Sequence, residues 1–352
     1  MIKKKKIISV MLVVTMLLSI DRAIFALENK VEDSKTINNK DLRLWYESPA
    51  EDSYNGWEKW SLPLGNGYMG ASVFGGVEYE RIQLTEKTFW SGGPSPSRPN
   101  YNGGNIVTNA KVKVNGVDVP IMKAIQDAFA RGDTATANSL CNKLTGVSDD
   151  AGTKGYGYFL SYGNMYLDFK NGVKTNNIQH YVRDLDLNTA ISSVKYDYNN
   201  VNYTREYFIS YPDNVMVTKL SASENKKLSF DVRVEPDNTG GGGPNTNNGY
   251  SRRFTRTSKD GVITIAGELN DNEMKFNSQT KVINTGGIIT DLADGKVNVT
   301  NADEVIIITS IATDYKNDYP NYRTGETDAE VANKVSKRVT DAAKKGYEGL
   351  KE

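Results

Sequence analysis

The stretch Leu44–Pro94 reads LWYESPAEDSYNGWEKWSLPLGNGYMGASVFGGVEYERIQLTEKTFWSGGP, and it fixes what fold to expect. Two glycines flank an asparagine in Leu64–Gly67, and all three residues tolerate positive φ, which predicts a tight turn. A strand is expected to follow at Gly70–Phe74, and Gly75-Gly76 marks a second turn. Polar and apolar residues then alternate over Glu80–Leu84, as in a strand with one face buried. The stretch therefore predicts antiparallel strands joined by short turns.

Short alternating runs continue along most of the chain. The clearest predicted strands are Met165–Phe169, Ala190–Tyr198, Tyr203–Ile209, Val215–Ser221, Leu228–Val234, Val262–Glu268, Lys281–Asn284 and Val305–Ala312. Hairpin turns are indicated at Asn199-Asn200, Asp260-Gly261 and Asp294-Gly295. Many short strands with turns at short intervals predict a mainly β fold, a large antiparallel β-sandwich or super-sandwich.

Two helical patterns interrupt the strands. Pro120–Leu144 carries apolar residues at helical spacing, is broken at Arg131-Gly132, and resumes after Asp133, which can cap the second half. We expect an inserted helix pair packed against a sheet. Near the end of the chain, Thr327 and Glu330 can form a capping box ahead of a helix. Its buried face is expected to carry Val331, Val335, Val339 and Ala342.

The ordered parts of the opening stretch resemble the start of the family 95 glycoside hydrolases, whose characterised members include α-L-fucosidases. These parts are LWY followed by PA, then LPLGNGYMGASVFGGV, then ERIQLTEKTFWSGGP. Later segments agree as well, namely KGYGYFLSYGNMYLDF, YVRDLDLNTA and YTREYFISYPDNVMV, so the resemblance runs from about residue 42 to residue 350. It implies an amino-terminal β domain that is followed, in the family, by a helical linker, an (α/α)6 barrel and a final β domain.

The resemblance also implies where the chemistry lies. In the family the barrel carries the general acid and the general base, asparagines assist the attacking water, and the reaction inverts the anomeric centre. No catalytic residue of the family has a matching position here, so we assign none, and the chain alone is expected to be inactive. The implied division is a signal peptide at 1–26, a flexible leader at 27–40, the β-sandwich domain at 41–315 and the start of the helical linker at 316–352.

Three residues of the opening stretch are candidates for contact with a sugar shared with a neighbouring domain. They are Asn66, Glu86 and Trp90, because amides and carboxylates bond hydroxyls and an aromatic face stacks on sugar C–H groups. The competing interpretation is purely structural, with a turn asparagine and a tryptophan packed at a strand end. The family commonly shows asparagine where this chain has Thr85, which puts a carried-over hydrogen bond at that position in doubt.

Composition narrows the possible chemistry further. Lys plus Arg and Asp plus Glu both number 43, so the net charge is zero and nothing favours nucleic acid as a partner. Cys141 and His180 are the single cysteine and histidine, which exclude an intramolecular disulfide and a Cys/His zinc site. No metal or cofactor is expected. The carboxylate pairs Asp184/Asp186 and Glu78/Glu80 lie two residues apart, and we interpret them as solvated faces rather than as a glycosidase pair.

The amino terminus has the pattern of a targeting segment. Lys3–Lys6 form a basic region, Ile7–Ile20 an apolar run of signal-peptide length, and Ala26 a plausible cleavage position. A secreted or cell-surface protein with no membrane association after cleavage is expected; an uncleaved anchor is the alternative. Gly240–Gly243 opens a low-complexity run that we interpret as a mobile loop.

Three functions remain open at this point. The first is the amino-terminal domain of a secreted α-L-fucosidase-like enzyme acting on fucosylated glycans, with the (α/α)6 catalytic barrel as its partner in a longer or neighbouring product. The second is a stand-alone carbohydrate-binding or surface module. The third keeps the enzyme family and changes the substrate to an α-L-galactoside.

Overall fold

A computed structural model describes residues 42–96, 98, 99, 101, 111–144, 157–237 and 252–352. The predicted signal peptide, the leader at 27–40 and the loop that begins at Gly240 lie outside the described residues. Within the described ranges, no helix is long and apolar enough to cross a membrane. By their internal contacts, the described residues of Leu44–Leu185 and Ala190–Glu352 form one compact unit.

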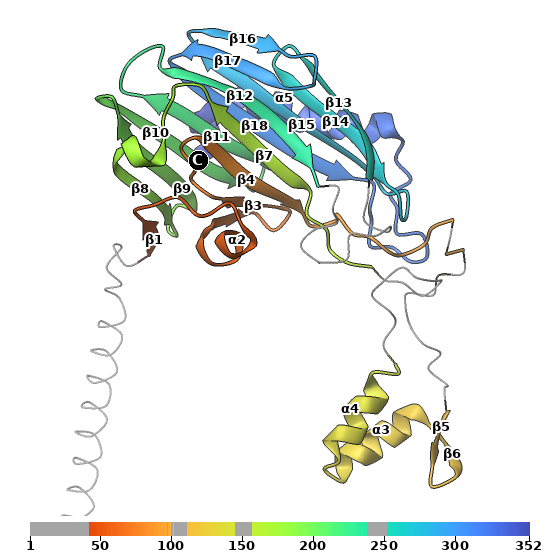
Figure 1. The fold of residues 1–352 in the computed structure, drawn as a ribbon. Coiled ribbons are helices and arrows are strands. Elements are labelled where there is room, and N and C mark those ends of the chain that lie inside the picture. The colour runs from red at the N-terminus through yellow and green to blue at the C-terminus, as the bar shows by residue number, and fades with distance from the viewer. Residues whose placement is uncertain (1–41, 97, 100, 102–110, 145–156, 238–251) are drawn as a thin grey trace, which may run out of the picture. The chain divides into compact units, whose positions relative to one another are not determined.

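Two large antiparallel sheets make up the β fold in the part of the chain that the structure describes (Figure 1). The order in the nine-stranded sheet is β1 (Arg43–Tyr46), β8 (Gln179–Asp186), β9 (Ile191–Tyr198), β10 (Val201–Ser210), β11 (Val215–Ala222), β18 (Glu304–Thr313), β15 (Lys275–Thr285), β14 (Val262–Leu269) and β13 (Arg252–Lys259). The order in the seven-stranded sheet is β16 (Ile288–Asp291), β17 (Val297–Ala302), β12 (Leu228–Pro236), β7 (Gly163–Phe169), β4 (Tyr79–Glu86), β3 (Met69–Val73) and β2 (Leu62–Gly65). The predicted mainly β sandwich is confirmed.

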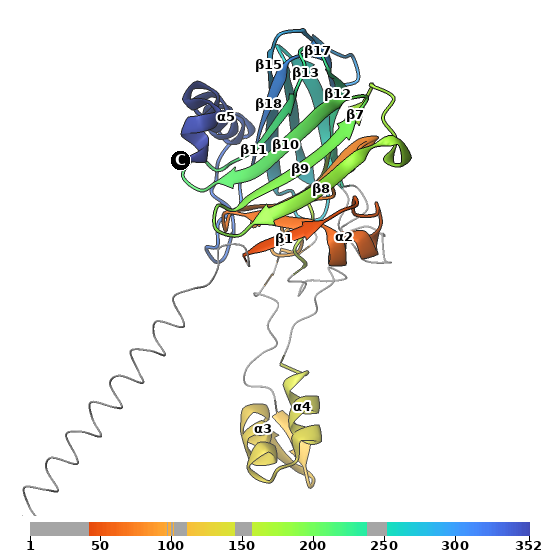
Figure 2. The same cartoon turned by 90° about the vertical axis from the view of Figure 1, so that its left-hand side faces the viewer.

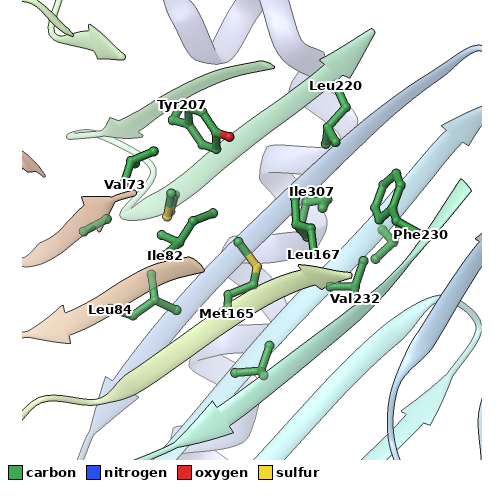
Figure 3. Packing of buried hydrophobic residues seen from close by; sticks show 14 of the residues in the cluster. Val73, Ile82, Leu84, Met165, Leu167, Tyr207, Leu220, Phe230, Val232 and Ile307 are labelled. Carbon is green, nitrogen blue, oxygen red and sulfur yellow. The ribbon is translucent and has the colours of Figure 1, made fainter. Parts of the chain in front are cut away.

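The hydrophobic core lies between the two sheets. Alternate residues of strands such as β4 and β12 point inward, so Ile82 and Leu84 of β4 are fully buried while their neighbours face outward. Figure 3 shows side chains of the seven-stranded sheet, such as Met165 and Phe230, beside Tyr207 and Ile307 of the nine-stranded sheet. Because both sheets bury one face in the same core, their strands alternate between apolar and polar residues, and this alternation is visible in the sequence.

The predicted hairpin turns are present. Asn199 and Asn200 have φ of 51° and 63° and join β9 to β10. Asp260 and Gly261 have φ of 52° and 71° and join β13 to β14. Two successive positive φ angles match the twist of the flanking strands, which is why Asn and Gly occur here. Gly295, with φ of 75°, lies in the connection between β16 and β17.

The helix pair inserted between β4 and β7 consists of α3 (Ile121–Ala130) and α4 (Thr134–Cys141). The side chain of Asp133 accepts a hydrogen bond from the Thr136 N–H at 3.0 Å, as expected for the cap of α4. α3 also contacts a separate two-stranded hairpin, β5 (Lys111–Val114) and β6 (Val117–Pro120). The sheet against which this helix pair packs is therefore a small one within the same insertion, and α3 makes the contact.

The carboxy-terminal helix α5 (Asp328–Lys351) lies on the outer side of the nine-stranded sheet, against β15, β18 and β11 (Figure 2). The predicted capping box is present: Thr327 accepts from the Glu330 N–H at 3.3 Å, and Glu330 accepts from the Thr327 N–H at 2.7 Å. The buried face is Val331, Val335, Val339, Ala342, Tyr347 and Leu350.

We predict that Thr327→Ala lowers the free energy of unfolding by about 1 kcal/mol, because the first turn of α5 loses its side-chain acceptor. Thr340→Ala, at an exposed position inside the same helix, is the matched control and is expected to leave stability unchanged or slightly raised. Urea unfolding followed by far-ultraviolet circular dichroism measures both variants. Equal midpoints for the two variants would contradict the capping role.

Candidate functional site

Asn66 closes the turn between β2 and β3. Its Oδ1 accepts hydrogen bonds from the N–H groups of Tyr68 and Met69, both at 2.8 Å. Its Nδ2 donates to the carbonyl of Ser210 at 2.8 Å and to Asn214 Oδ1 at 3.2 Å, where β10 turns into β11. The whole amide is used to hold one sheet's turn to the other sheet, so Asn66 acts structurally in this arrangement.

Glu86 is the last residue of β4 and is completely buried. Its Oε2 accepts from the Thr88 N–H at 2.9 Å and from the Thr88 hydroxyl at 2.5 Å. Among the described residues, its Oε1 has no hydrogen-bond partner. Burial raises the pKa of the Glu86 carboxyl, because the charged form loses its hydration. A side chain that points inward from the strand does not reach a ligand at the outer surface.

Trp90 is the one of the three candidates with an exposed side chain, at 38% of its surface. Its backbone forms an isolated bridge with Phe159, and the two rings lie 6.2 Å apart at 47°. The Trp90 carbonyl accepts from Asn272 Nδ2 at 3.1 Å. Asn66 bonds the turn between β10 and β11, Glu86 bonds Thr88 inside the fold, and Trp90 contacts Phe159 and Asn272, so the three candidates lie in different surroundings.

A pocket of about 430 Å³ lies on the outer face of β4 and β7. Its aromatic lining is Tyr54, Trp57 and Phe159, and its polar lining includes Arg81, Gln83, Thr85, Ser161, Asn164 and Asp237. The period-two alternation of β4 explains the arrangement: the residues between the buried ones face outward. In the motif ERIQLTE the outer face thus carries Thr85, at the position where the resemblance showed a departure, and not Glu86.

Arg81 is fixed at the floor of this pocket. Its Nε donates to Asn164 Oδ1 at 2.8 Å, and its Nη1 forms an ion pair with Asp52. Asp52 also accepts from the Tyr79 hydroxyl at 2.8 Å. The Arg81 guanidinium lies over the Phe74 ring, 4.6 Å from its centre. These contacts hold the guanidinium in one place and compensate its charge.

The rim of the pocket comes from the short helix α2 (Tyr54–Trp60), which sequence reasoning missed. Ser53 caps it by accepting from the Gly56 N–H at 3.0 Å. A Cβ at Gly56 would lie 1.9 Å from the Glu51 carbonyl oxygen, so only glycine fits there. The helix projects Tyr54 and Trp57 together, with ring centres 5.6 Å apart. The signal for it was present in SYNGW: a capping serine and two aromatics three residues apart.

A second hollow, of about 220 Å³, lies beside Trp90. Tyr101, Tyr315 and Tyr322 contribute to its lining together with Asn272 and Arg323. The rings of Tyr315 and Tyr322 are stacked at 17° with centres 6.5 Å apart. These aromatics pack mainly on one another, so the hollow is smaller and better filled than the pocket on β4 and β7.

The predicted solvated carboxylates behave differently from one another. Glu80 is completely buried and Asp184 is nearly so, accepting from the Ser193 hydroxyl at 2.6 Å; the solvated interpretation is wrong for these two, because buried partners bond them. Glu78 is exposed and pairs with Lys174 at 2.6 Å. Across the described ranges, no group of three His, Cys, Asp or Glu residues has the geometry to hold a metal ion.

The fold defined here is a β-sandwich of the kind found at the amino terminus of glycoside hydrolases. A sequence profile described as "Glycosyl hydrolase family 65, N-terminal domain" matches residues 44–318. The chain belongs to that family of amino-terminal domains.

Individual relatives agree with this assignment. The chain is 24% identical to "Alpha-L-fucosidase 2" of Arabidopsis thaliana over 322 residues, which is 89% of this chain and 35% of that protein. It is 30% identical to "Probable alpha-fucosidase A" of Aspergillus niger over 183 residues, 51% of this chain and 20% of that protein. Among solved structures, "Putative kojibiose phosphorylase from human microbiome" matches with a TM-score of 0.50 and 10% identity, over 88% of this chain and 36% of that one. The last match concerns the fold alone. The chain spans about a third or less of the curated relatives it matches.

Proposed function

We propose that this chain is the non-catalytic amino-terminal β-sandwich domain of a secreted, family 95-like α-L-fucosidase that acts on fucosylated glycans. The observation that carries the proposal is the extent of the match: 89% of the chain aligns with a protein named as an α-L-fucosidase, yet only 35% of that protein is covered. The relatives are larger enzymes, and the matched part is the amino-terminal domain of a glycoside hydrolase family. The remainder of such an enzyme supplies a catalytic domain as the partner.

In this proposal the sandwich supports an (α/α)6 barrel, and the segment from residue 316, which contains α5, begins the helical linker to it. The barrel selects the sugar, so an α-L-galactoside is the alternative substrate within the same family. A stand-alone carbohydrate-binding module is the second candidate function, and it is favoured by the aromatic and polar pocket on β4 and β7.

We predict that the purified chain does not hydrolyse 4-nitrophenyl α-L-fucoside or the matching α-L-galactoside above the buffer rate. The physical reason is that hydrolysis needs an acid and a base across the glycosidic bond, and the proposal locates both in the barrel. A product that continues in frame through a helical barrel is expected to hydrolyse one of the two glycosides, and the preferred one identifies the substrate.

Two results would contradict the proposal. Turnover by the chain alone would show that the sandwich carries the chemistry itself. A reading frame that stops at Glu352, with no barrel encoded nearby, would favour the stand-alone module.

A further inference from the structure

We propose that the pocket on the outer face of β4 and β7 binds one neutral pyranose unit of a glycan. The aromatic rings of α2 would lie against the C–H face of the sugar, and the polar side chains of the two strands would bond its hydroxyls. The inference is carried by this chain's own geometry and does not depend on the proposed enzymatic partner.

The rim of the pocket brings three exposed aromatic side chains together. Tyr54 is 61% exposed, Trp57 37% and Phe159 46%, although they come from two segments about a hundred residues apart. Exposed aromatic side chains that gather around one concavity mark a binding site, because water leaves such surfaces readily when a ligand arrives. Flat rings with polar edges suit a sugar, which presents an apolar C–H face and a hydroxylated rim.

The floor offers hydrogen-bond donors that are held in position. The Nε and Nη1 of Arg81 are used by Asn164 and Asp52, which fixes the plane of the guanidinium. Among the described residues, neither the Nη2 of Arg81 nor the Nδ2 of Asn164 donates to a protein acceptor, and the Oδ1 of Asn164 already accepts from Arg81. Two oriented donors with no protein acceptor are available to the oxygens of neighbouring hydroxyls, and their positions are set before a ligand binds.

Charge and size favour a neutral sugar over an anion. The Arg81 charge is balanced by Asp52, and the carboxylate of Asp237 also lines the pocket. Arg252 is close enough to Asp237 to interact with its charge, so charges of both signs balance around the pocket and no uncompensated cation attracts a phosphate or a uronate. The volume of about 430 Å³ is at the small end of the usual range for ligand pockets, roughly 300–1,000 Å³, and accommodates one sugar ring better than an extended chain.

The experiment is saturation-transfer difference NMR on the purified chain. The probes are methyl α-L-fucopyranoside, methyl β-D-galactopyranoside, methyl α-D-glucopyranoside and, as the anionic comparison, D-galacturonate. Dissociation constants are expected near 1 mM, about −4 kcal/mol, as for a single small site with few fixed contacts. Trp57→Ala is expected to weaken binding of the preferred glycoside about tenfold by removing one stacking face.

Trp45→Ala is the matched control, since Trp45 is a tryptophan on β1, 60% exposed, that does not line the pocket. It is expected to bind as the unmodified chain does. If Trp57→Ala does not fold, as judged by circular dichroism, Tyr54→Ala replaces it, because a ring that is 61% exposed contributes little to folding.

Each result decides the matter. Binding that is lost in Trp57→Ala or Tyr54→Ala and kept in Trp45→Ala supports the site. No saturation transfer from any neutral glycoside, or equal binding by the rim variants and the unmodified chain, overturns it. Preferential binding of galacturonate would show that the ligand is an anionic sugar and not a neutral one. Because the readout is binding to this chain, none of these results depends on whether the longer enzyme hydrolyses a fucoside.

Discussion

Arg205→Ala is expected to lower the free energy of unfolding by about 3–5 kcal/mol, because it leaves a carboxylate buried without its counter-ion. Arg205 on β10 and Glu80 on β4 form an ion pair of 2.9 Å that crosses the core from one sheet to the other. Both side chains are almost completely buried, at 3% and 0% exposure. Glu80 also accepts from the Tyr207 hydroxyl and the Gly75 N–H, each at 2.7 Å, so its position is fixed when the arginine is removed.

The loss in Arg205→Ala should depend on pH. Burial raises the pKa of the Glu80 carboxyl above its ordinary value of 4.5, because the charged form loses its hydration. A group whose pKa is raised by folding stabilises the fold at pH values below its pKa in the unfolded chain. That stabilisation is lost as the pH rises through its pKa in the folded chain. Removing Arg205 takes away a charge that lowers this pKa. The variant is therefore expected to regain stability as the pH falls from 7 towards 4.5, more than the unmodified chain does.

Urea unfolding at pH 7 and at pH 5 measures both effects. The double variant Glu80→Leu with Arg205→Met tests the cause, since replacing both charges by apolar groups of similar size is expected to recover most of the loss. The surface control is Arg233→Ala, whose partner Asp168 is 32% exposed, with an expected change below about 1 kcal/mol. A loss in Arg205→Ala no greater than in Arg233→Ala would show that the buried pair does not matter.

The pair of Arg205 and Glu80 shows what can and what cannot be predicted from the sequence. The alternation in ERIQLTE correctly indicates a strand and places Ile82 and Leu84 inward. It places Glu80 inward by the same rule, but a carboxylate in isolation is interpreted as solvated. Only the fold brings Arg205 to it from a strand 125 residues later in the chain. The local alternation of residues predicts which face of a strand a residue occupies. It does not predict that a charged residue is buried, because the oppositely charged partner lies far away in the sequence.

Elements with little apolar contrast were harder to predict. β13, RRFTRTSK, is the last strand in its sheet and buries only Arg252, so no apolar alternation marks it. β15 begins at Lys275 and not at Lys281 as expected, because its first half buries the polar residues Asn277, Ser278 and Thr280. Thr280 shares a hydroxyl hydrogen bond of 3.0 Å with Thr309 of the neighbouring strand β18, and Ser278 shares one with the Tyr162 hydroxyl of the facing side.

The residues of the candidate site were harder to predict than the strands. A family resemblance highlights residues that relatives share, and shared residues include those that hold a turn. The polar atoms of Asn66 bond the protein itself and the Glu86 side chain points inward, which favours a structural role for both residues. The pocket residues instead come from the short helix α2, which contains a glycine, and from the outward positions of β4. The alternation of β4 shows which of its residues face outward, but nothing in the sequence places α2 beside them, so the pocket could be recognised only in three dimensions.

Asp271→Ala is also expected to lower the free energy of unfolding by about 3–5 kcal/mol. Asp271 lies in the connection between β14 and β15 and forms an ion pair with Arg98 at 2.5 Å. The two side chains are 2% and 1% exposed, so the variant would leave a buried guanidinium unpaired. Asp271 also accepts from the Gly92 N–H at 2.5 Å, and Arg98 donates to the Gly93 carbonyl at 2.7 Å. The variant thus removes the support of the turn that follows Trp90.

Asp271→Asn separates the charge from the hydrogen bonds, because the amide oxygen still accepts while the ion pair is gone; an intermediate loss is expected. Asp294→Ala, in an exposed hairpin ion pair with Lys296, is the control and should stay within about 1 kcal/mol of the unmodified chain. Urea unfolding gives all three values. A loss in Asp271→Ala equal to that of the control would contradict the structural interpretation of the motif FWSGGP.

The Asp271 variants also connect the motif to the pocket. The Trp90 ring contacts Phe159, and Phe159 forms part of the pocket rim, so releasing the turn after Trp90 frees one wall of the proposed sugar site. Asp271→Asn, at a temperature where it is fully folded, is expected to weaken glycoside binding less than Trp57→Ala does, because the α2 rings and the Arg81 floor remain. Unchanged binding would mean that Phe159 does not contribute to the site. Binding weaker than in Trp57→Ala would mean that the Trp90 turn, and not α2, supplies the main face for the sugar.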